Sequence, residues 1–365
     1  EKPDIILILN ETFYDLRDLV DIETDTEFMP FIDQSRDLIK GRAVVAGTGG
    51  GTNKSEYELL TSNSFQLMPG ITPFNYLDFH NANSVVSFLK AQGYSTWGAH
   101  CANPLNYSRG KVYPLLGFDK IMFKDDFPSA EQYGKRWYAT DESVYSVMCD
   151  EYEKMGDSPR LMYMLTIQNH GGYLTNTNWK DPVYPEGSHL PETKEFLSAT
   201  KVSDDAFQYL VKYFEKQDEP TIICMFGDHH PSIETEFYET LLGKKQSDWG
   251  LEEIQKRYAT PFIIWANYDI EEAKEVSISN NYLENMLLKQ AGITLPLYNQ
   301  YIEKVSQDIP AMNVNGYMDM NGKWHNYGDS ESKTVSSLLH NYEILQYGYY
   351  SDSDKTTMKK LFQWK

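Results

Sequence analysis

The sequence has 365 residues and carries 33 Lys and Arg against 53 Asp and Glu, a formal net charge of −20. A chain of this sign repels nucleic-acid phosphates and anionic lipid surfaces, which argues against a nucleic-acid-binding protein and against an electrostatically docked membrane protein. Its three cysteines form no C-x-x-C pair, which excludes a disulfide scaffold and a thiolate zinc site. With 41% hydrophobic residues the chain can bury a large core, as one large α/β domain or two moderate ones.

Short apolar runs alternate with helical patterns along most of the chain. Strands are predicted at 5–9, 42–46, 94–98, 161–166, 221–226 and 261–266, and helices at 55–60, 84–92, 141–154 and 196–214. The strands are apolar almost throughout, which is typical of a parallel sheet with both faces buried. The alternation predicts an α/β fold, with a central, mainly parallel sheet flanked by helices. In the helix at 196–214, Asp204 and Asp205 lie off the apolar stripe and are interpreted as a solvated pair.

The chain changes character after about residue 305. Asn321-Gly322 between alternating residues predicts a hairpin, and a further helix is predicted at 336–346. We therefore predict a main domain at 1–305 and a small C-terminal appendage at 306–365, with the hairpin and helix of the appendage packed on the main domain.

Polar groups that can bind metals or act as nucleophiles follow the predicted strands. In chain order they are Glu11, a glycine-rich stretch with Thr52, His100, His170 and the run Asp228-His229-His230. The carboxyl ends of parallel strands meet at one edge of a sheet, and ligands bind at that edge. We therefore expect these groups to form a single site.

Thr52 follows three glycines, Gly49 to Gly51, and stands at the start of a predicted helix. Glycines let the backbone approach a ligand closely, and the amides at a helix N-terminus favour an anion. Two roles for Thr52 stay open. It is either an N-cap of the helix or a nucleophile whose hydroxyl is deprotonated by metal coordination.

Glu11 also has two interpretations, as a cap for a helical segment at 12–14 or as an oxygen ligand of a divalent cation. Asp228 and His229 offer one oxygen and one nitrogen from adjacent positions, a donor set suited to manganese, zinc or magnesium. His230, beside them, is interpreted as structural.

Five short motifs occur in a fixed order along the chain. They are Asn10-Glu11-Thr12-Phe13, Gly50-Gly51-Thr52-Asn53-Lys54-Ser55-Glu56-Tyr57, Arg109 ahead of 112–119, Asn169-His170, and Gly227-Asp228-His229. In this order and combination they resemble the lipoteichoic acid synthase group, sulfatase-like members of the alkaline phosphatase superfamily. Where that group carries a stacking aromatic before its substrate-binding arginine, this chain reads Asn106-Tyr107-Ser108-Arg109, so the stacking residue is Tyr107.

The resemblance implies that 1–305 is a sulfatase-like catalytic domain, a phosphoglycerol transferase that moves glycerol phosphate from phosphatidylglycerol to a cell-envelope polymer or glycolipid. It implies one divalent cation, manganese first with magnesium or zinc as alternatives, held by Glu11, Thr52, Asp228 and His229. Thr52 would attack phosphorus and form a phospho-threonine intermediate. The substrate would be bound by Arg109, His170, Tyr107 and His100. A dication and an arginine are what a phosphodiester needs to neutralise its developing charge.

The same resemblance implies a polyol or glycan acceptor and a place at the outer face of a bacterial cell membrane. The anchor would be a segment absent from this chain, and the abrupt entry from Glu1-Lys2-Pro3-Asp4 into a strand favours a trimmed fragment. Two alternatives remain. One is a metal-dependent phosphodiesterase or phosphatase of the same superfamily, and the other is a catalytically inactive relative that binds a glycan.

Overall fold

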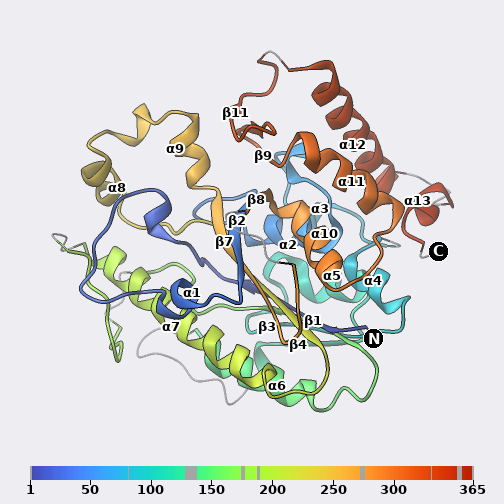
Figure 1. The fold of residues 1–365 in the computed structure, drawn as a ribbon, viewed down its shortest axis with the longest axis horizontal. Coiled ribbons are helices and arrows are strands. Elements are labelled where there is room, and N and C mark those ends of the chain that lie inside the picture. The colour runs from blue at the N-terminus through green and yellow to red at the C-terminus, as the bar shows by residue number, and fades with distance from the viewer. Residues whose placement is uncertain are drawn as a thin grey trace.

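The apolar runs of the sequence form one sheet at the centre of the protein, as Figure 1 shows. The computed structural model describes residues 2–80, 82–127, 138–173, 177–186, 190–271, 276–329, 331–351 and 356–363. Within these residues the sheet has eight strands, in the spatial order β4 (Lys120–Phe123), β3 (Ser95–His100), β5 (Arg160–Leu165), β1 (Asp4–Asn10), β6 (Thr221–Gly227), β7 (Ala259–Ala266), β2 (Ile39–Val44) and β8 (Val276–Ser279). In this described part β7 alone runs antiparallel to its neighbours, so the sheet is mainly parallel, as predicted.

Successive residues of the central strands point to opposite faces of the sheet, and each face is covered by its own helices. One face carries Ile6 and Ile8 of β1 and packs on α1 (Pro30–Gln34), α6 (Asp141–Tyr152) and α7 (Pro191–Phe214). The opposite face carries Ile5, Leu7 and Leu9 and packs on α2 (Thr52–Thr61), α3 (Pro73–Tyr76), α4 (Val85–Lys90), α5 (Arg109–Leu116) and α10 (Asn280–Gln290). Two further helices, α8 (Thr235–Leu242) and α9 (Leu251–Lys256), extend the first face.

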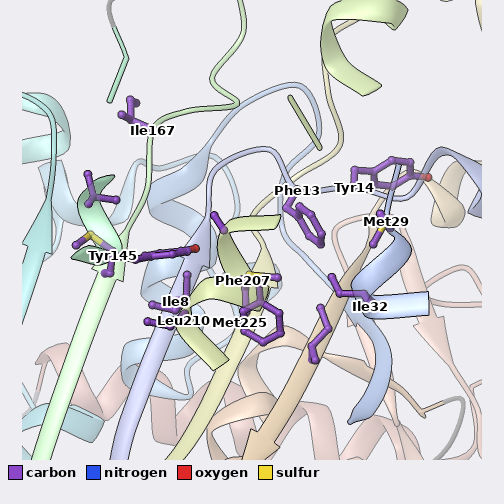
Figure 2. Packing of buried hydrophobic residues seen from close by; sticks show 14 of the residues in the cluster. Ile8, Phe13, Tyr14, Met29, Ile32, Tyr145, Ile167, Phe207, Leu210 and Met225 are labelled. Atoms are coloured by element: carbon purple, nitrogen blue, oxygen red, sulfur yellow. The ribbon is translucent and has the colours of Figure 1, made fainter. Parts of the chain in front are cut away.

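On the first face, the apolar stripe of α7 packs against the side chains of the sheet. Figure 2 shows Phe207 and Leu210 of α7 against Met225 of β6. Each such side chain, once fully buried, stabilises the fold by about 1.5–3 kcal/mol. The three-residue spacing of Phe207 and Leu210 puts both on one side of α7, and this side faces the sheet.

Asp204 lies on this buried side of α7, which corrects the interpretation of Asp204 and Asp205 as a solvated pair. Asp204 is fully buried, and its carboxylate accepts the backbone N–H groups of Phe31 (2.7 Å) and Ile32 (3.0 Å) at the start of α1. Asp205 is exposed, as predicted. The stripe rule failed at Asp204 because its partner is a helix end, whose free N–H groups need an acceptor.

The C-terminal elements form a third cluster with α10. They are α11 (Leu297–Asp308), the strands β9 (Ala311–Asn313), β10 (Gly316–Met318) and β11 (Trp324–His325), and the helices α12 (Lys333–Ser351) and α13 (Thr356–Leu361). β10 pairs antiparallel with β11, so the predicted hairpin forms. The division at 305/306 falls inside α11, and it remains a prediction. Among the described helices none has the length and apolar character that crossing a bilayer requires.

Candidate active site at the carboxyl edge of the sheet

Glu11, Asp228 and His229 come together because β1 and β6 are neighbours in the sheet. The two strands are paired in parallel up to Asn10 and Gly227, so the residues that follow each strand leave the sheet side by side. A ligand atom of Glu11, one of Asp228 and one of His229 all lie within 4.8 Å of one another, and all three residues are buried. Glu11, Asp228 and His229 therefore lie together at the carboxyl edge of the sheet, as their positions after the strands predicted.

The chain between Glu11 and Phe13 is shaped by a close backbone approach. A Cβ atom at Gly227 would lie 1.7 Å from the carbonyl oxygen of Phe13, so only glycine fits there. Thr12 has a φ of 51°, its N–H donates to Oδ1 of Asp228 at 2.6 Å, and its hydroxyl donates to Oε1 of Glu11 at 2.8 Å. Residues 12–14, all of them described, form no helix. Glu11 therefore caps no helix at 12–14, and its role as an oxygen ligand of a cation remains a prediction.

The side chain of His229 turns one nitrogen toward the two carboxylates. Nδ1 lies 3.0 Å from the carbonyl oxygen of His230, while Nε2 lies 3.2 Å from Oδ2 of Asp228 and 3.5 Å from Oε1 of Glu11. A proton on Nδ1 leaves the Nε2 lone pair facing the carboxylates, the arrangement of a metal-binding histidine.

The electrostatics of this cluster fit a divalent cation. Oδ2 of Asp228 is buried and accepts no hydrogen bond from the described residues. Burial, with the charge of Glu11 added, raises the pKa of Asp228 to about 6. Burial lowers the pKa of His229, but the charges of Asp228 and Glu11 outweigh it and the net direction is upward. Two carboxylates and an imidazole held this close, with one oxygen unpaired, are the donor set and the unmet charge that a dication would satisfy.

Thr52 is the first residue of α2 and faces the same cluster. Gly51 precedes it with a φ of 93°, and the N-cap position has no side-chain hydrogen bond to the helix. The Thr52 hydroxyl instead donates to Oε2 of Glu11 at 3.3 Å. One turn along, the Ser55 hydroxyl donates to the carbonyl oxygen of Asp228 at 2.6 Å and ties α2 to the end of β6. The N-cap role left open for Thr52 is therefore not the one its hydroxyl takes.

Arg109 lies at the start of α5 with its guanidinium buried. Nε and Nη2 donate to Oε2 of Glu56 at 2.8 and 2.5 Å, and the guanidinium carbon lies 5.1 Å from the centre of the Tyr107 ring. Tyr107 and Ser108 both have left-handed backbone angles, with φ of 51° and 57°. Such angles are strained in residues other than glycine and are frequent at functional sites. Burial lowers the pKa of Arg109, and the Glu56 carboxylate more than reverses this.

His100 and His170 complete the wall of one cavity. Nδ1 of His100, a buried residue, lies 3.0 Å from the carbonyl oxygen of Leu165, and burial followed by the charge of Arg109 holds the pKa of His100 well below its usual value. His170 is exposed, with Nδ1 3.2 Å from the Tyr138 hydroxyl. The cavity measures about 390 Å³, and of the predicted site residues it is lined by Glu11, Thr52, His100, Tyr107, Arg109, His170 and His229. Asp228 lies buried beside it.

His230 is packed away from this cavity, as expected of a structural residue. Its ring contacts Tyr14 and Tyr238, with centroids 4.7 and 5.2 Å away. Three residues that hold the site together, Thr12, Ser55 and Glu56, were not predicted from the sequence as site residues. A signal existed for Glu56, since it stands four residues after Thr52 and so shares its face of α2.

Comparisons with known proteins identify the family and the fold. The sulfatase family model matches residues 3–293. A candidate cyclic beta-1,2-glucan modification protein of Rhizobium meliloti is 28% identical over 359 residues, which is 95% of this chain and 54% of that protein. The chain spans about half the length of the curated relatives it matches.

Solved structures that share the fold include the following two. The phosphoglycerol transferase GacH of Streptococcus pyogenes, in complex with sn-glycerol-1-phosphate, has a TM-score of 0.78 at 18% identity, over 99% of this chain and 89% of that one. The lipoteichoic acid synthase LtaP of Listeria monocytogenes has a TM-score of 0.68 at 15% identity, over 96% of this chain and 92% of that one.

Proposed function

The chain belongs to the sulfatase family within the alkaline phosphatase superfamily, and from this premise we propose that it is a phosphoglycerol transferase. In this proposal it moves glycerol phosphate from a phosphatidylglycerol-type lipid to a polyol or glycan of the cell envelope, through a covalent intermediate on Thr52. The observation that carries the proposal is the position of the Thr52 hydroxyl. It lies at a helix start, 3.3 Å from Glu11, in a cavity that also holds Arg109.

The proposed reaction has two displacements at phosphorus, and each of them forms one phosphorus–oxygen bond and breaks another. In the first, Oγ1 of Thr52 gives up its proton and forms a bond to phosphorus, while the bond from phosphorus to the diacylglycerol oxygen breaks and that oxygen takes up a proton. In the second, the oxygen of an acceptor hydroxyl loses its proton and forms a bond to phosphorus, while the bond from phosphorus to Oγ1 of Thr52 breaks and Oγ1 takes up a proton. Arg109 holds the phosphate oxygens, with Tyr107, His100 and His170 lining the rest of the cavity.

We propose that Glu11, Thr52, Asp228 and His229 hold one divalent cation, with manganese first and magnesium or zinc as alternatives. The support is the unpaired Oδ2 of Asp228, the 4.8 Å spread of the donor atoms and the Nε2 of His229 turned toward them. Such a cation supplies charge neutralisation at phosphorus and a lower pKa for a coordinated hydroxyl. The four residues supply its oxygen and nitrogen ligands.

The proposal of a glycan acceptor is supported by the names of similar proteins, which refer to polymers of the cell envelope. The Rhizobium relative is named for glucan modification, and the Listeria structure is a lipoteichoic acid synthase. The proposal places the enzyme at the outer face of a bacterial membrane, where such lipids and glycans meet.

The experiment measures diacylglycerol release from a fluorescent phosphatidylglycerol in the presence of manganese, with intact-protein mass spectrometry of the same sample. We expect release, together with a protein mass raised by one glycerophosphoryl group. Thr52→Ala should abolish both signals, since it removes the nucleophile. Thr52→Ser keeps the hydroxyl and should retain measurable release, which makes it the matched control.

Three outcomes would contradict the proposal in different ways. Release that survives in Thr52→Ala would remove the covalent mechanism. Release of free glycerol phosphate that never passes to an added polyol or glycan would indicate a phosphodiesterase. A folded protein without turnover under manganese, magnesium and zinc would indicate an inactive glycan-binding relative.

A further inference from the structure

Glu56 is a fully buried carboxylate on α2 whose oxygens are both occupied. Oε2 accepts two hydrogen bonds from Arg109, at 2.8 Å from Nε and 2.5 Å from Nη2. Oε1 accepts the hydroxyl of Tyr113 at 2.6 Å and that of Tyr163 at 3.1 Å. The side chains of Arg109 and Glu56 are 3% and 0% exposed, so this ion pair is shielded from water.

Such a pair is a weak source of stability, because the cost of removing two charges from water offsets most of their attraction. Its geometry, in contrast, is tightly specified. Four donors from α5 and β5 converge on one carboxylate, which leaves the Arg109 guanidinium a single orientation relative to α2. Thr52 lies on the same helix, four residues earlier and so on the same face.

We propose that Glu56 is a positioning residue, which fixes Arg109 relative to the Thr52 hydroxyl and selects for phosphodiesters over phosphomonoesters. The proposal rests on the proposed function, since it takes Arg109 as the group that receives the phosphate. Glu56 touches no substrate and acts through the arginine. The helix α2 thereby carries both Thr52, the proposed nucleophile, and Glu56, which orients the arginine that binds the phosphate.

Selectivity follows from the charge that Glu56 adds. The pair of Arg109 and Glu56 is neutral as a unit, so it offers a phosphate directed N–H groups without a net positive charge. The spare donors are on Nη1, which makes one long contact of 3.4 Å to the carbonyl oxygen of Asn106, and on the second hydrogen of Nη2. A phosphodiester carries one negative charge, whereas a phosphomonoester carries close to two at neutral pH. An uncompensated arginine would favour the more highly charged monoester, and Glu56 removes that preference.

The test compares Glu56→Gln with the unmodified protein, using kcat and KM for phosphatidylglycerol and the affinity for glycerol phosphate, a monoester, by calorimetry. The amide keeps the shape of the carboxylate and removes its charge. We expect kcat to fall by about 100-fold, as for a displaced catalytic geometry, with KM changed far less. The affinity for glycerol phosphate should rise by about tenfold, because Arg109 becomes an unpaired cation.

Tyr163→Phe is the matched control, because it removes one hydrogen bond from the same carboxylate and leaves its charge. It should leave the affinity for glycerol phosphate unchanged. A double variant, Glu56→Gln with Arg109→Ala, should bind glycerol phosphate no better than Arg109→Ala alone, since Glu56 acts through the arginine. A Glu56→Gln protein that binds glycerol phosphate more weakly, or that binds it equally, overturns the proposal.

A second variant carries the test if Glu56→Gln does not fold, as judged by circular dichroism. Glu56→Asp keeps the negative charge but shortens the side chain by one methylene group, which moves the carboxylate away from Arg109. It should lower kcat by about tenfold or more without raising the affinity for glycerol phosphate, and an unchanged kcat would contradict the positioning role. A folded wild-type protein without lipid turnover would refute the proposed function, while the calorimetry would still decide the effect of Glu56 on phosphate selectivity.

Discussion

The hydrogen atom that stands in place of a side chain at Gly227 allows the loop after β1 to lie against the end of β6. Gly227→Ala would put a Cβ atom 1.7 Å from the carbonyl oxygen of Phe13, a contact with backbone that no side-chain rotation relieves. We expect the free energy of unfolding to fall by about 3 kcal/mol, the upper range for overpacked sites. Denaturation in urea, followed by circular dichroism, measures the change.

Gly171→Ala is the control for that substitution. A Cβ atom at Gly171 meets nothing within 4 Å, and its φ lies outside the left-handed region. Its free energy of unfolding should change by less than about 1 kcal/mol, since only the entropy of the unfolded chain is affected. Equal unfolding midpoints for the two variants would show that the loop moves away from β6 at little cost.

At the scale of residues, the sequence predicted the groups that follow apolar strands. Glu11, Asp228 and His229 could be placed together because the register of parallel strands carries residues to a shared edge. Thr12 could not be found, because its contribution depends on a left-handed φ of 51° that no periodicity reveals. The spacing from Thr52 could have placed Glu56 on the face of α2 toward the site, but its partners Tyr113, Tyr163 and Arg109 come from other elements and could not be predicted.

At the scale of elements, α7 stabilises the start of α1 through one carboxylate. Asp204→Ala would leave the N–H groups of Phe31 and Ile32 without the acceptor they have at 2.7 and 3.0 Å. We expect a loss of about 2 kcal/mol in the free energy of unfolding, the cost of losing a helix cap with buried donors. Chemical denaturation measures it.

Asp205→Ala offers the control one residue further along α7. The Asp205 side chain is 53% exposed and pairs with Lys201 at 3.2 Å, an exposed pair four residues apart. Its removal should change the free energy of unfolding by less than about 0.5 kcal/mol. The assignment of Asp204 as a cap would be wrong if both alanine variants behaved alike.

The strands of the central sheet that the sequence predicted are those with continuous apolar character, and the strands it missed lie at the two edges of the sheet. β4 and β8 are each four residues long and only partly buried, so neither shows the apolar run of a central strand. The antiparallel direction of β7 could not be predicted from the sequence either. A strand buried on both faces has the same composition whether it runs parallel or antiparallel to its neighbours.

At the scale of the whole molecule, the formal net charge of −20 counts every Asp and Glu as ionised, whereas burial favours the protonated form of some of them. Glu58 on α2 and Glu284 on α10 are both fully buried where these helices meet the C-terminal elements, and burial raises the pKa of Glu58 to about 8 and that of Glu284 to about 7. Glu284 accepts the Ser62 hydroxyl at 2.6 Å and the Asn299 side-chain amide of α11 at 3.1 Å. The third cluster thus meets the sheet domain near buried acids whose pKa values lie well above the usual range of a carboxyl group.

The stability of the protein should therefore decline as the pH rises through neutrality. The folded state holds the Glu58 proton up to pH about 8, while the unfolded chain releases it near 4.5, so the free energy of unfolding falls between these values and levels off above them. We expect the Glu58 contribution to fall by an amount on the order of 3 kcal/mol between pH 5 and 8. In Glu58→Gln that slope should be reduced, whereas Glu23→Gln, at an exposed position, should keep it. Urea denaturation at a series of pH values measures how the free energy of unfolding depends on pH. A Glu58→Gln protein with the same pH dependence as the wild type would mean that Glu58 is ionised in the folded state.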